Sequence, residues 1–296
     1  MLRTIPFILS HPLNRNGKVR ALGRLLRWQV TSRLSSKPQI VSFVDDTILS
    51  MESGMTGATG NYYCGLHEHD DMAFVLHCLR PDDLFLDIGA NIGTYTVLAA
   101  GAVGARTMTF EPIPETFGKL QRNISVNELG ALATCHNIGL GAEDGTLQFT
   151  ADNDTMNHVV SAEEAARIAT IDIPVRRVDD LVGEQAPLLA KIDVEGWEAN
   201  VLRGMTRTLA NPSLCAIVME TNDSAERYDG EAQDEAAMIV RDAGFIPHSY
   251  DPFARTLSPV KPGQAQTHNT IFVRGLDEVQ NRVARARKFR LINGEI

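Results

Sequence analysis

Two kinds of apolar pattern alternate along the chain from about residue 70. Residues 70–80 repeat apolar side chains at helical spacing up to Pro81, and residues 84–88 form the short continuous apolar run of a buried strand. The same patterns predict helices over residues 94–100, 114–129, 197–209 and 231–243. Further strands are predicted over residues 107–110, 134–139, 188–193, 216–220, 245–250 and 270–274.

Strands that alternate with helices predict a parallel sheet, because each helix carries the chain back across the sheet. The last two strands have no helix between them, so we expect them to pair as an antiparallel edge. The predicted fold is therefore α/β, a doubly wound, mostly parallel seven-stranded sheet of the Rossmann-like type with an antiparallel last strand.

The remaining segments divide the chain into four parts. Residues 1–37 form a basic amphipathic leader, and residues 38–69, rich in Gly and Thr, form a small accessory element. Residues 70–275 form the α/β domain, and residues 276–296 are predicted to be a basic C-terminal helix.

The leader contains eight Lys or Arg residues and no acidic residue, with Leu22, Leu25 and Leu26 among its apolar positions. Such a helix can lie on an anionic membrane at the cytoplasmic face. Alternatively, the leucines pack on the acidic domain and the arginines are solvated or paired to it. A mitochondrial transit peptide has a similar composition, but the bacterial type of the resemblance described below makes it the weaker alternative.

Composition excludes several function classes. Of the 296 residues, 44% are hydrophobic and 22% charged, which is typical of a folded globular protein. All 37 acidic residues lie outside the leader, so an acidic body argues against a nucleic-acid partner. Four dispersed cysteines suggest a reducing cytoplasm, and we identify no cleaved signal or transmembrane helix. The oligomeric state is not encoded in these patterns.

A glycine-rich loop follows the first predicted strand of the domain. Asp87 ends this strand, and Gly89, Asn91 and Gly93 lead into a helix. Glycine lets the backbone approach a ligand closely, and a dinucleotide-binding loop would need a second glycine where Asn91 stands. S-adenosylmethionine (SAM) has no phosphate and tolerates that side chain.

A second acid, Glu111, ends the next strand and is followed by Pro112. A carboxylate at this place can accept hydrogen bonds from both ribose hydroxyls of a bound nucleoside. The two acids together favour SAM, with a NAD-type fold as the alternative.

Four stretches of this sequence resemble the FkbM family of SAM-dependent methyltransferases. They are Asp-Ile-Gly-Ala-Asn-Ile-Gly at residues 87–93, Phe-Glu-Pro-Ile-Pro at 110–114, Lys-Ile-Asp-Val-Glu-Gly-Trp-Glu at 191–198 and Asn-Thr-Ile-Phe-Val at 269–273. The resemblance covers roughly residues 62–274 and includes Tyr63, Gly65 and Glu68 near the expected acceptor pocket. It implies methyl transfer, usually to an oxygen of a glycan, polyketide or related small molecule. Trp197 replaces an expected Phe or Tyr.

The most specific stretch places Lys191, Asp193 and Glu195 at the carboxyl end of a strand, where ligands bind in this fold. A carboxylate beside a bound cation can accept the proton of an alcohol, and Lys191 can lower the pKa of that carboxylate or orient the acceptor. A structural role is the alternative, in which the two acids cap the next helix and Lys191 pairs with them.

Two further clusters contain histidines. His158 lies in a polar loop predicted to cross the mouth of the active site, where it is a base, an acceptor contact or simply solvated. His67 and His69 alternate with acids in a metal-like pattern, but an acidic helix start at Asp70 and Asp71 explains them without a ligand. We predict no metal.

The sequence therefore predicts a SAM-dependent methyltransferase that acts on a hydroxyl of a saccharide, glycan or secondary metabolite. A catalytically silent SAM-fold module that binds a partner, or a NAD-dependent oxidoreductase, remains as an alternative.

Overall fold

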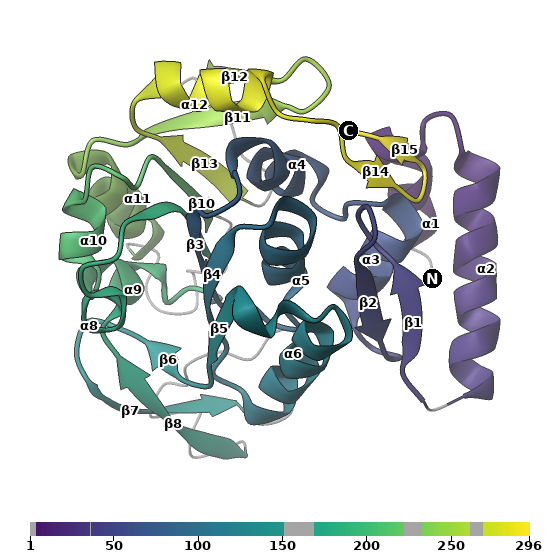
Figure 1. The fold of residues 1–296 in the computed structure, drawn as a ribbon. Coiled ribbons are helices and arrows are strands. Elements are labelled where there is room, and N and C mark those ends of the chain that lie inside the picture. The colour runs from purple at the N-terminus through teal and green to yellow at the C-terminus, as the bar shows by residue number, and fades with distance from the viewer. Residues whose placement is uncertain (1–3, 36, 151–168, 222–231, 261–268) are drawn as a thin grey trace.

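An eight-stranded sheet forms the centre of the molecule (Figure 1). The computed structural model describes residues 4–35, 37–150, 169–221, 232–260 and 269–296. The strands, in their order across the sheet, are β12 (Thr256–Pro259), β11 (Ile246–Asp251), β13 (Asn269–Val273), β10 (Ala216–Glu220), β9 (Pro187–Ile192), β3 (Leu84–Ile88), β4 (Arg106–Phe110) and β5 (Ala133–His136).

The sheet is doubly wound, as predicted. Strands β5, β4, β3, β9 and β10 are parallel, and the chain reverses its direction of winding between β3 and β9. The predicted pairing of the last two strands is correct, because β11 and β13 are antiparallel. Their predicted position at the edge is wrong for β13, which lies between β10 and β11. The edge strand is β12, which comes from a stretch without a strand pattern and pairs with β11.

Helices cover both faces of the sheet, which is why most residues of its inner strands are buried. One face packs against α4 (His69–Cys78), α6 (Pro114–Val126), α12 (Leu276–Ala284) and α5 (Thr94–Thr96), which continues as a π-helix over Val97–Val103 (Figure 1). The other packs against α8 (Val178–Val182), α9 (Glu198–Arg203), α10 (Thr206–Ala210) and α11 (Ala232–Asp242). On β3, Phe85 belongs to the first core, and Leu86 to the second.

The helix predicted over residues 197–209 is two helices, α9 and α10. The buried carboxylate of Asp179 accepts hydrogen bonds from the backbone amides of Arg207 and Thr208, at 2.9 Å each, in the first turn of α10. At the break, a Cβ on Gly204 would lie 2.0 Å from the carbonyl oxygen of Gly141. Helix α9 thus ends where the backbone of Gly141 approaches closely, and α10 begins where Asp179 caps it. Helical periodicity predicts neither feature, because both come from residues distant in sequence.

A second, three-stranded sheet lies beside the carboxyl ends of β4 and β9. Its strands are β6 (Gly139–Leu140), β7 (Gly145–Thr150) and β8 (Thr170–Arg176), in the order β6-β8-β7. Phe149 and Ile173 from this sheet pack with Ile113 and Trp197, which attaches it to the main domain.

The N-terminal part consists of α1 (Thr4–Ser10), the 3₁₀ turn Pro12–Asn14, α2 (Lys18–Leu34), the hairpin β1 (Gln39–Ser42) and β2 (Ile48–Met51), and α3 (Thr56–Cys64). The predicted leader helix exists as α2, but its apolar positions lie on different faces. Leu25 is buried, Leu22 is partly buried and Leu26 is 66% exposed. The alternative that the leader packs on the domain is therefore correct for Leu25 and wrong for Leu26.

The C-terminal prediction needs a correction. The helix α12 ends at Ala284, and β14 (Arg290–Leu291) and β15 (Gly294–Glu295) form a hairpin after it. The reason is local, since Asn293-Gly294 is a turn-forming pair that helical spacing overlooks. A short 3₁₀ turn over Leu129–Ala131 completes the described elements.

Two asparagines join the N-terminal and C-terminal segments. The Nδ2 of Asn14, a fully buried side chain, donates to the carbonyl oxygens of Ile8 at 3.1 Å and Tyr63 at 3.3 Å. Its Oδ1 accepts from Arg24 at 3.2 Å and from Nδ2 of Asn293 at 3.1 Å. One side chain thus ties α1, α2, α3 and the C-terminal hairpin together.

We expect Asn14→Ala to lower the free energy of unfolding by about 2–3 kcal/mol, because it removes the Asn14 donor from the carbonyl oxygen of Ile8 and a buried acceptor from Arg24 and Asn293. Urea denaturation measures this change, and hydrogen exchange should show faster opening of α1 and α2 than of the central sheet. Asn16→Ala, at an exposed position two residues later, is the matched control and should be neutral. Equal stability of the two variants would contradict the role of Asn14.

Candidate active site

A cavity of about 360 Å³ opens at the carboxyl ends of β3, β4, β9 and β10. This is the edge where the winding of the sheet reverses, and the volume is within the range of small-molecule sites. The cavity is lined from β3 and its loop, from the strand ends at Glu111, Asp193 and Glu220, from α3, and from the small sheet through Leu140 and Phe149.

The loop between β3 and α5 forms one wall of the cavity. Its backbone takes the left-handed conformation at Gly89, Asn91 and Gly93, with φ of +78°, +51° and +82°. Asn91 stabilises its own conformation, because its Oδ1 accepts a hydrogen bond from the amide of Ile92 at 2.8 Å. The loop is thus held open by two glycines and by an asparagine, a residue that tolerates this region of backbone conformation.

Gly89 is required for a reason that differs from the predicted one. We expected it to leave room for a ligand, but a Cβ there would lie 1.8 Å from the carbonyl oxygen of Asp193. The amide of Asp193 also donates to the carbonyl of Ile88 at 3.0 Å. Gly89 therefore lets the glycine loop and the loop after β9 touch, and this contact brings the two halves of the site together.

Asp87 is the last residue but one of β3 and is buried, with 1% of its surface exposed. Its Oδ2 accepts a hydrogen bond from Thr96 at 2.6 Å, whereas its Oδ1 has no partner among the described residues. Burial raises the pKa of Asp87 to about 6, against the opposing effects of Thr96 and Lys191. A buried acceptor without a partner at a cavity wall is suited to a ligand that donates a hydrogen bond.

Glu111 directly follows β4, lies on the same wall and is 5% exposed. Its two carboxyl oxygens accept hydrogen bonds from the amides of Asn91 and Ile113, at 2.9 Å each. Burial raises the pKa of Glu111 to about 8, although both amide bonds oppose the shift. The side chain thus connects the glycine loop to the start of α6, next to Pro112, which also lines the cavity.

Lys191 and Asp193 face each other where β9 ends. Lys191 Nζ donates to Asp193 Oδ2 at 2.5 Å, and the lysine side chain is buried while that of Asp193 is 31% exposed. Burial alone would lower the pKa of Lys191, but the neighbouring Asp193, Glu68 and Asp87 outweigh it and raise the pKa. The predicted ion pair therefore exists, and Asp193 still reaches the cavity.

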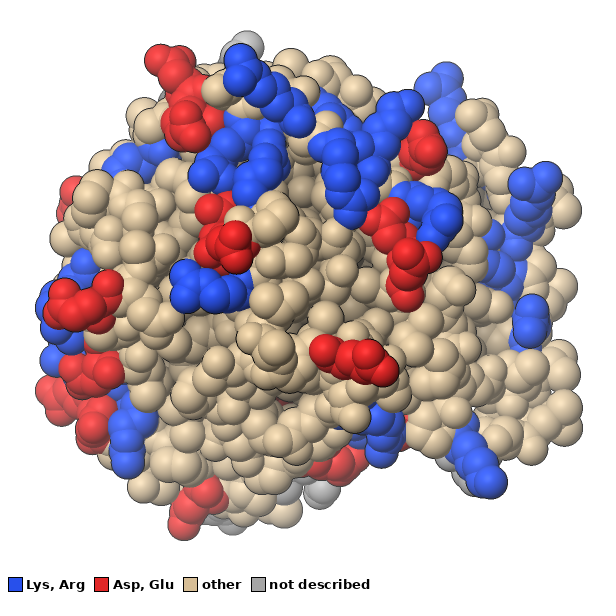
Figure 2. All heavy atoms as spheres, in the orientation of Figure 1, with Lys and Arg blue, Asp and Glu red and all other residues tan. Residues whose placement is uncertain are grey.

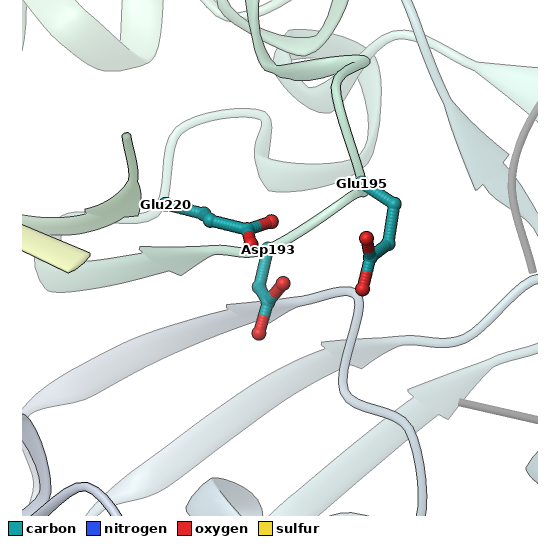
Figure 3. Close-up of side chains that lie close together, drawn as sticks. All are labelled: Asp193, Glu195 and Glu220. Atoms are coloured by element: carbon teal, nitrogen blue, oxygen red, sulfur yellow. The ribbon is translucent and has the colours of Figure 1, made fainter. Parts of the chain in front are cut away.

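Two further acids, Glu195 and Glu220, lie close to Asp193 of this pair (Figure 3). Asp193, Glu195 and Glu220 each offer a carboxylate oxygen within 4.8 Å of the other two, from the loop after β9 and the end of β10. Burial, followed by the charges of Asp193 and Glu195, raises the pKa of Glu220 to about 9. Glu220 was missed, although the pairing of neighbouring parallel strands could have placed it beside Asp193.

Glu195 does not cap the following helix as the structural alternative proposed. It lies in a turn with φ of +51° before α9, whose N-cap residue is Trp197 and whose N-terminus has no side-chain cap. Glu198 Oε1 accepts from the amides of Val194 and Gly196, at 3.2 Å each, within that turn. Glu195 lines the cavity close to Asp193.

A second residue that sequence reasoning did not single out, Tyr95, packs against Lys191. The ring of Tyr95, buried on α5, lies 4.7 Å from Lys191 Nζ, and the Tyr95 hydroxyl donates to Glu68 Oε2 at 2.7 Å. Next to Glu68, Asp71 accepts from Asn269 at 3.0 Å, and burial raises the pKa of Asp71 to about 7. Two segments far apart in sequence, around residues 68 and 269, are thus in contact near Lys191.

The histidine predictions have different outcomes. His158 lies outside the described residues. His67 lines the cavity, whereas His69 pairs with Asp70 at 2.8 Å. Among the residues that the structure describes, only Asp193, Glu195 and Glu220 form a group with metal-ligand spacing, so the 67–71 segment does not.

Comparisons with known proteins match the same region. Residues 87–247 match a family model described as the methyltransferase FkbM domain. "Methyltransferase 1" of Beauveria bassiana is 34% identical over 42% of this chain, which spans 59% of that protein. Hexuronic acid methyltransferase AglP of Haloferax volcanii is 30% identical over 60% of this chain and 75% of its own length. A solved structure of a putative rRNA methylase from Clostridium thermocellum covers 69% of this chain and 92% of its own, with 10% identity and a TM-score of 0.44.

We expect Gly89→Ala to destabilise the protein by more than the roughly 1–2 kcal/mol that a left-handed conformation costs a residue with a Cβ. The additional loss comes from the clash with the Asp193 carbonyl. Guanidinium denaturation measures it. Gly118→Ala is the control, because a Cβ at this helical, exposed position meets nothing within 4 Å and should stabilise α6 by about 0.5–1 kcal/mol. A Gly89 variant as stable as the parent would disprove the close contact.

Proposed function

Because the chain belongs to the FkbM methyltransferase family, as its motifs predicted, we propose that it methylates a hydroxyl oxygen with SAM as the methyl donor. The acceptor that we propose is a saccharide, glycan or secondary metabolite. One observation carries the proposal: the cavity joins a buried acid with a free acceptor atom, Asp87, to a cluster of acids around Asp193.

The wall formed by β3 and β4 fits the nucleoside end of SAM. The residues that would hold it are Asp87, Gly89, Asn91, Gly93, Glu111 and Pro112. Hydroxyl and amino groups of the cofactor offer the donors that Asp87 Oδ1 lacks, and Asn91 occupies a position where a pyrophosphate would need glycine. This donor and acceptor set supports SAM over a dinucleotide.

The other wall is acidic. SAM supplies a methyl group bound to a positively charged sulfur, and such a cation is stabilised by nearby carboxylates and favours their ionised form. Asp193, Glu195 and Glu220 lie together here, and Lys191, a buried cation beside them, is already paired to Asp193. The charge of this wall therefore supports a cationic ligand.

Asp193 is the residue that we propose accepts the proton of the acceptor hydroxyl. Its carboxylate reaches the cavity, and its bond to Lys191 fixes its orientation. Glu220 is less suited to this role, because a carboxyl group with a pKa of about 9 already holds a proton at neutral pH. Lys191 and Glu195 remain candidates for orienting the acceptor, and His158 remains a candidate from the sequence.

The acceptor class rests on the relatives. AglP is named for methylation of a hexuronic acid, and its similarity extends over three quarters of its length. A sugar hydroxyl as the acceptor of this chain is consistent with that similarity and with the polar wall around Asp193. Incubation with methyl-labelled SAM and glycan or metabolite fractions, followed by location of the label, tests the acceptor directly.

We expect the purified protein to bind SAM and S-adenosylhomocysteine in calorimetry, and Glu111→Ala to weaken SAM binding by roughly 1.5–3 kcal/mol through lost hydrogen bonds. Thermal unfolding of the ligand-free variant separates lost binding from lost stability, because Glu111 also anchors the amides of Asn91 and Ile113.

Glu115→Ala is the matched control for this prediction. Glu115 lies one helical turn further along, its side chain is 81% exposed, and its loss should leave SAM affinity unchanged. Tight binding of NADH without binding of SAM would refute the proposed cofactor, and an unchanged affinity of Glu111→Ala would remove Glu111 from the site.

For the chemical step, we expect Asp193→Asn to lower the single-turnover rate by about 10²–10⁴-fold, the usual range for loss of a general base, with SAM affinity nearly intact. This variant also leaves buried Lys191 without its countercharge. The double variant Lys191→Met/Asp193→Asn removes both charges and should remain equally slow. Recovery of the rate in the double variant, or parallel losses of rate and SAM affinity in Asp193→Asn, would show that Asp193 serves structure or cofactor binding instead.

A further inference from the structure

Helix α2 has one face buried against the protein. Ala21, Leu25 and Trp28 are each at most 5% exposed. The Trp28 ring lies 6.3 Å from that of Tyr62 on α3, and Arg24 donates to the carbonyl oxygen of Tyr63 at 2.6 Å. These contacts hold α2 on the protein, and its other apolar side chains take no part in them.

The opposite face of α2 is apolar and exposed. Val19 is 84% exposed, Leu26 66%, Val30 57% and Leu34 82%. Their spacing of seven, four and four residues places them in one line along the helix, because such intervals return to the same face. A solvated helix normally presents polar residues here, so these four side chains indicate a surface that contacts something apolar.

Cations border this line. Arg27 and Arg33 lie on either side of the line, near Leu26 and Val30. Lys18 and Arg20 flank its first residue, Val19. All four basic side chains are exposed. Residues 1–37 contain no acidic residue, so nothing within the segment neutralises them. Figure 2 shows basic side chains separated by uncharged surface along the edge where α2 lies, with the acidic residues of this view gathered elsewhere.

We propose that this face of α2, defined by Val19, Leu26, Val30 and Leu34 with Arg20, Arg27 and Arg33, binds the surface of an anionic lipid bilayer. The aliphatic side chains enter the boundary of the headgroups, and the arginines pair with lipid phosphates. The contact is peripheral, because no described helix is long and apolar enough to cross a membrane.

Charge distinguishes this occupant from the alternatives. A second copy of the chain meeting the same face would oppose two cationic surfaces without acids between them, which disfavours the pairing. A nucleic acid would use the arginines but not the aliphatic line. An anionic bilayer satisfies both features at once.

A single helix, α3, connects α2 to the cavity. Tyr62 and Tyr63 of α3 contact α2, while Ala58 and Asn61 of the same helix line the cavity. Docking through α2 therefore brings the cavity near the bilayer. Membrane binding through α2 does not depend on the proposed methyl transfer.

The test uses co-sedimentation of the full chain with vesicles of phosphatidylcholine alone or with about 30% phosphatidylglycerol. We expect binding to the anionic vesicles only, weakened by salt because screening acts on the arginines. Leu26→Ser/Val30→Ser and Arg27→Gln/Arg33→Gln should each lower the partition coefficient at least tenfold, with unchanged circular dichroism.

Controls come from α11, which carries an exposed apolar residue and an exposed cation on another face. Met238, 53% exposed, and Arg241 are replaced in Met238→Ser and Arg241→Gln, which should bind vesicles like the parent. Binding that all variants share, or equal binding to neutral vesicles, overturns the proposal. So does a dimer in light scattering that Leu26→Ser/Val30→Ser dissociates, since the face would then serve a second copy.

Discussion

The site depends on the contact between the backbone at Gly89 and the carbonyl group of Asp193. A Cβ at residue 89 would lie 1.8 Å from that oxygen, and the amide of Asp193 donates to Ile88 at 3.0 Å. Since β3 and β9 are adjacent parallel strands at the reversal of the winding, their loops must pass each other closely. This approach places the wall containing Asp87 and Glu111 against the wall containing Asp193 and Glu220, and the cavity is the space between them.

The electrostatics of the cavity follow from this geometry. Burial raises the pKa values of Asp87, Glu111 and Glu220, while Lys191 is the cation buried among them and is paired to Asp193. A positively charged ligand bound beside these carboxyl groups would favour their ionised form, and the attraction between the charges is stronger here than at an exposed site. A site of this kind is suited to a sulfonium donor, which is the chemistry proposed for a member of the FkbM methyltransferase family.

The N-terminal segment shows how one helix can serve two surfaces. Asn14 and Asn293 join α1, α2, α3 and the C-terminal hairpin, so α2 is held without using its full apolar surface. Leu25 therefore belongs to the core, and Leu26, the next residue, faces outward. The helix that supports α3 at the cavity also presents the face proposed to contact lipid.

Sequence alone determined the parallel part of the sheet, because buried strands and the helices between them are local patterns; the observed β3 spans the predicted residues 84–88. It did not determine the antiparallel part, where β13 lies between β10 and β11 and β12 forms the edge. It also singled out Asp87, Glu111, Lys191 and Asp193, which line the cavity, since acids and a lysine at strand ends are visible as motifs. Tertiary structure decided the rest. Asp179 binds the start of α10 from 27 residues away, at the point where a single helix was predicted. Glu220, from the neighbouring strand, lies close to Asp193, and the ring of Tyr95 packs against Lys191. These contacts depend on where separate elements come to lie, and helical or strand periodicity carries no information about that placement.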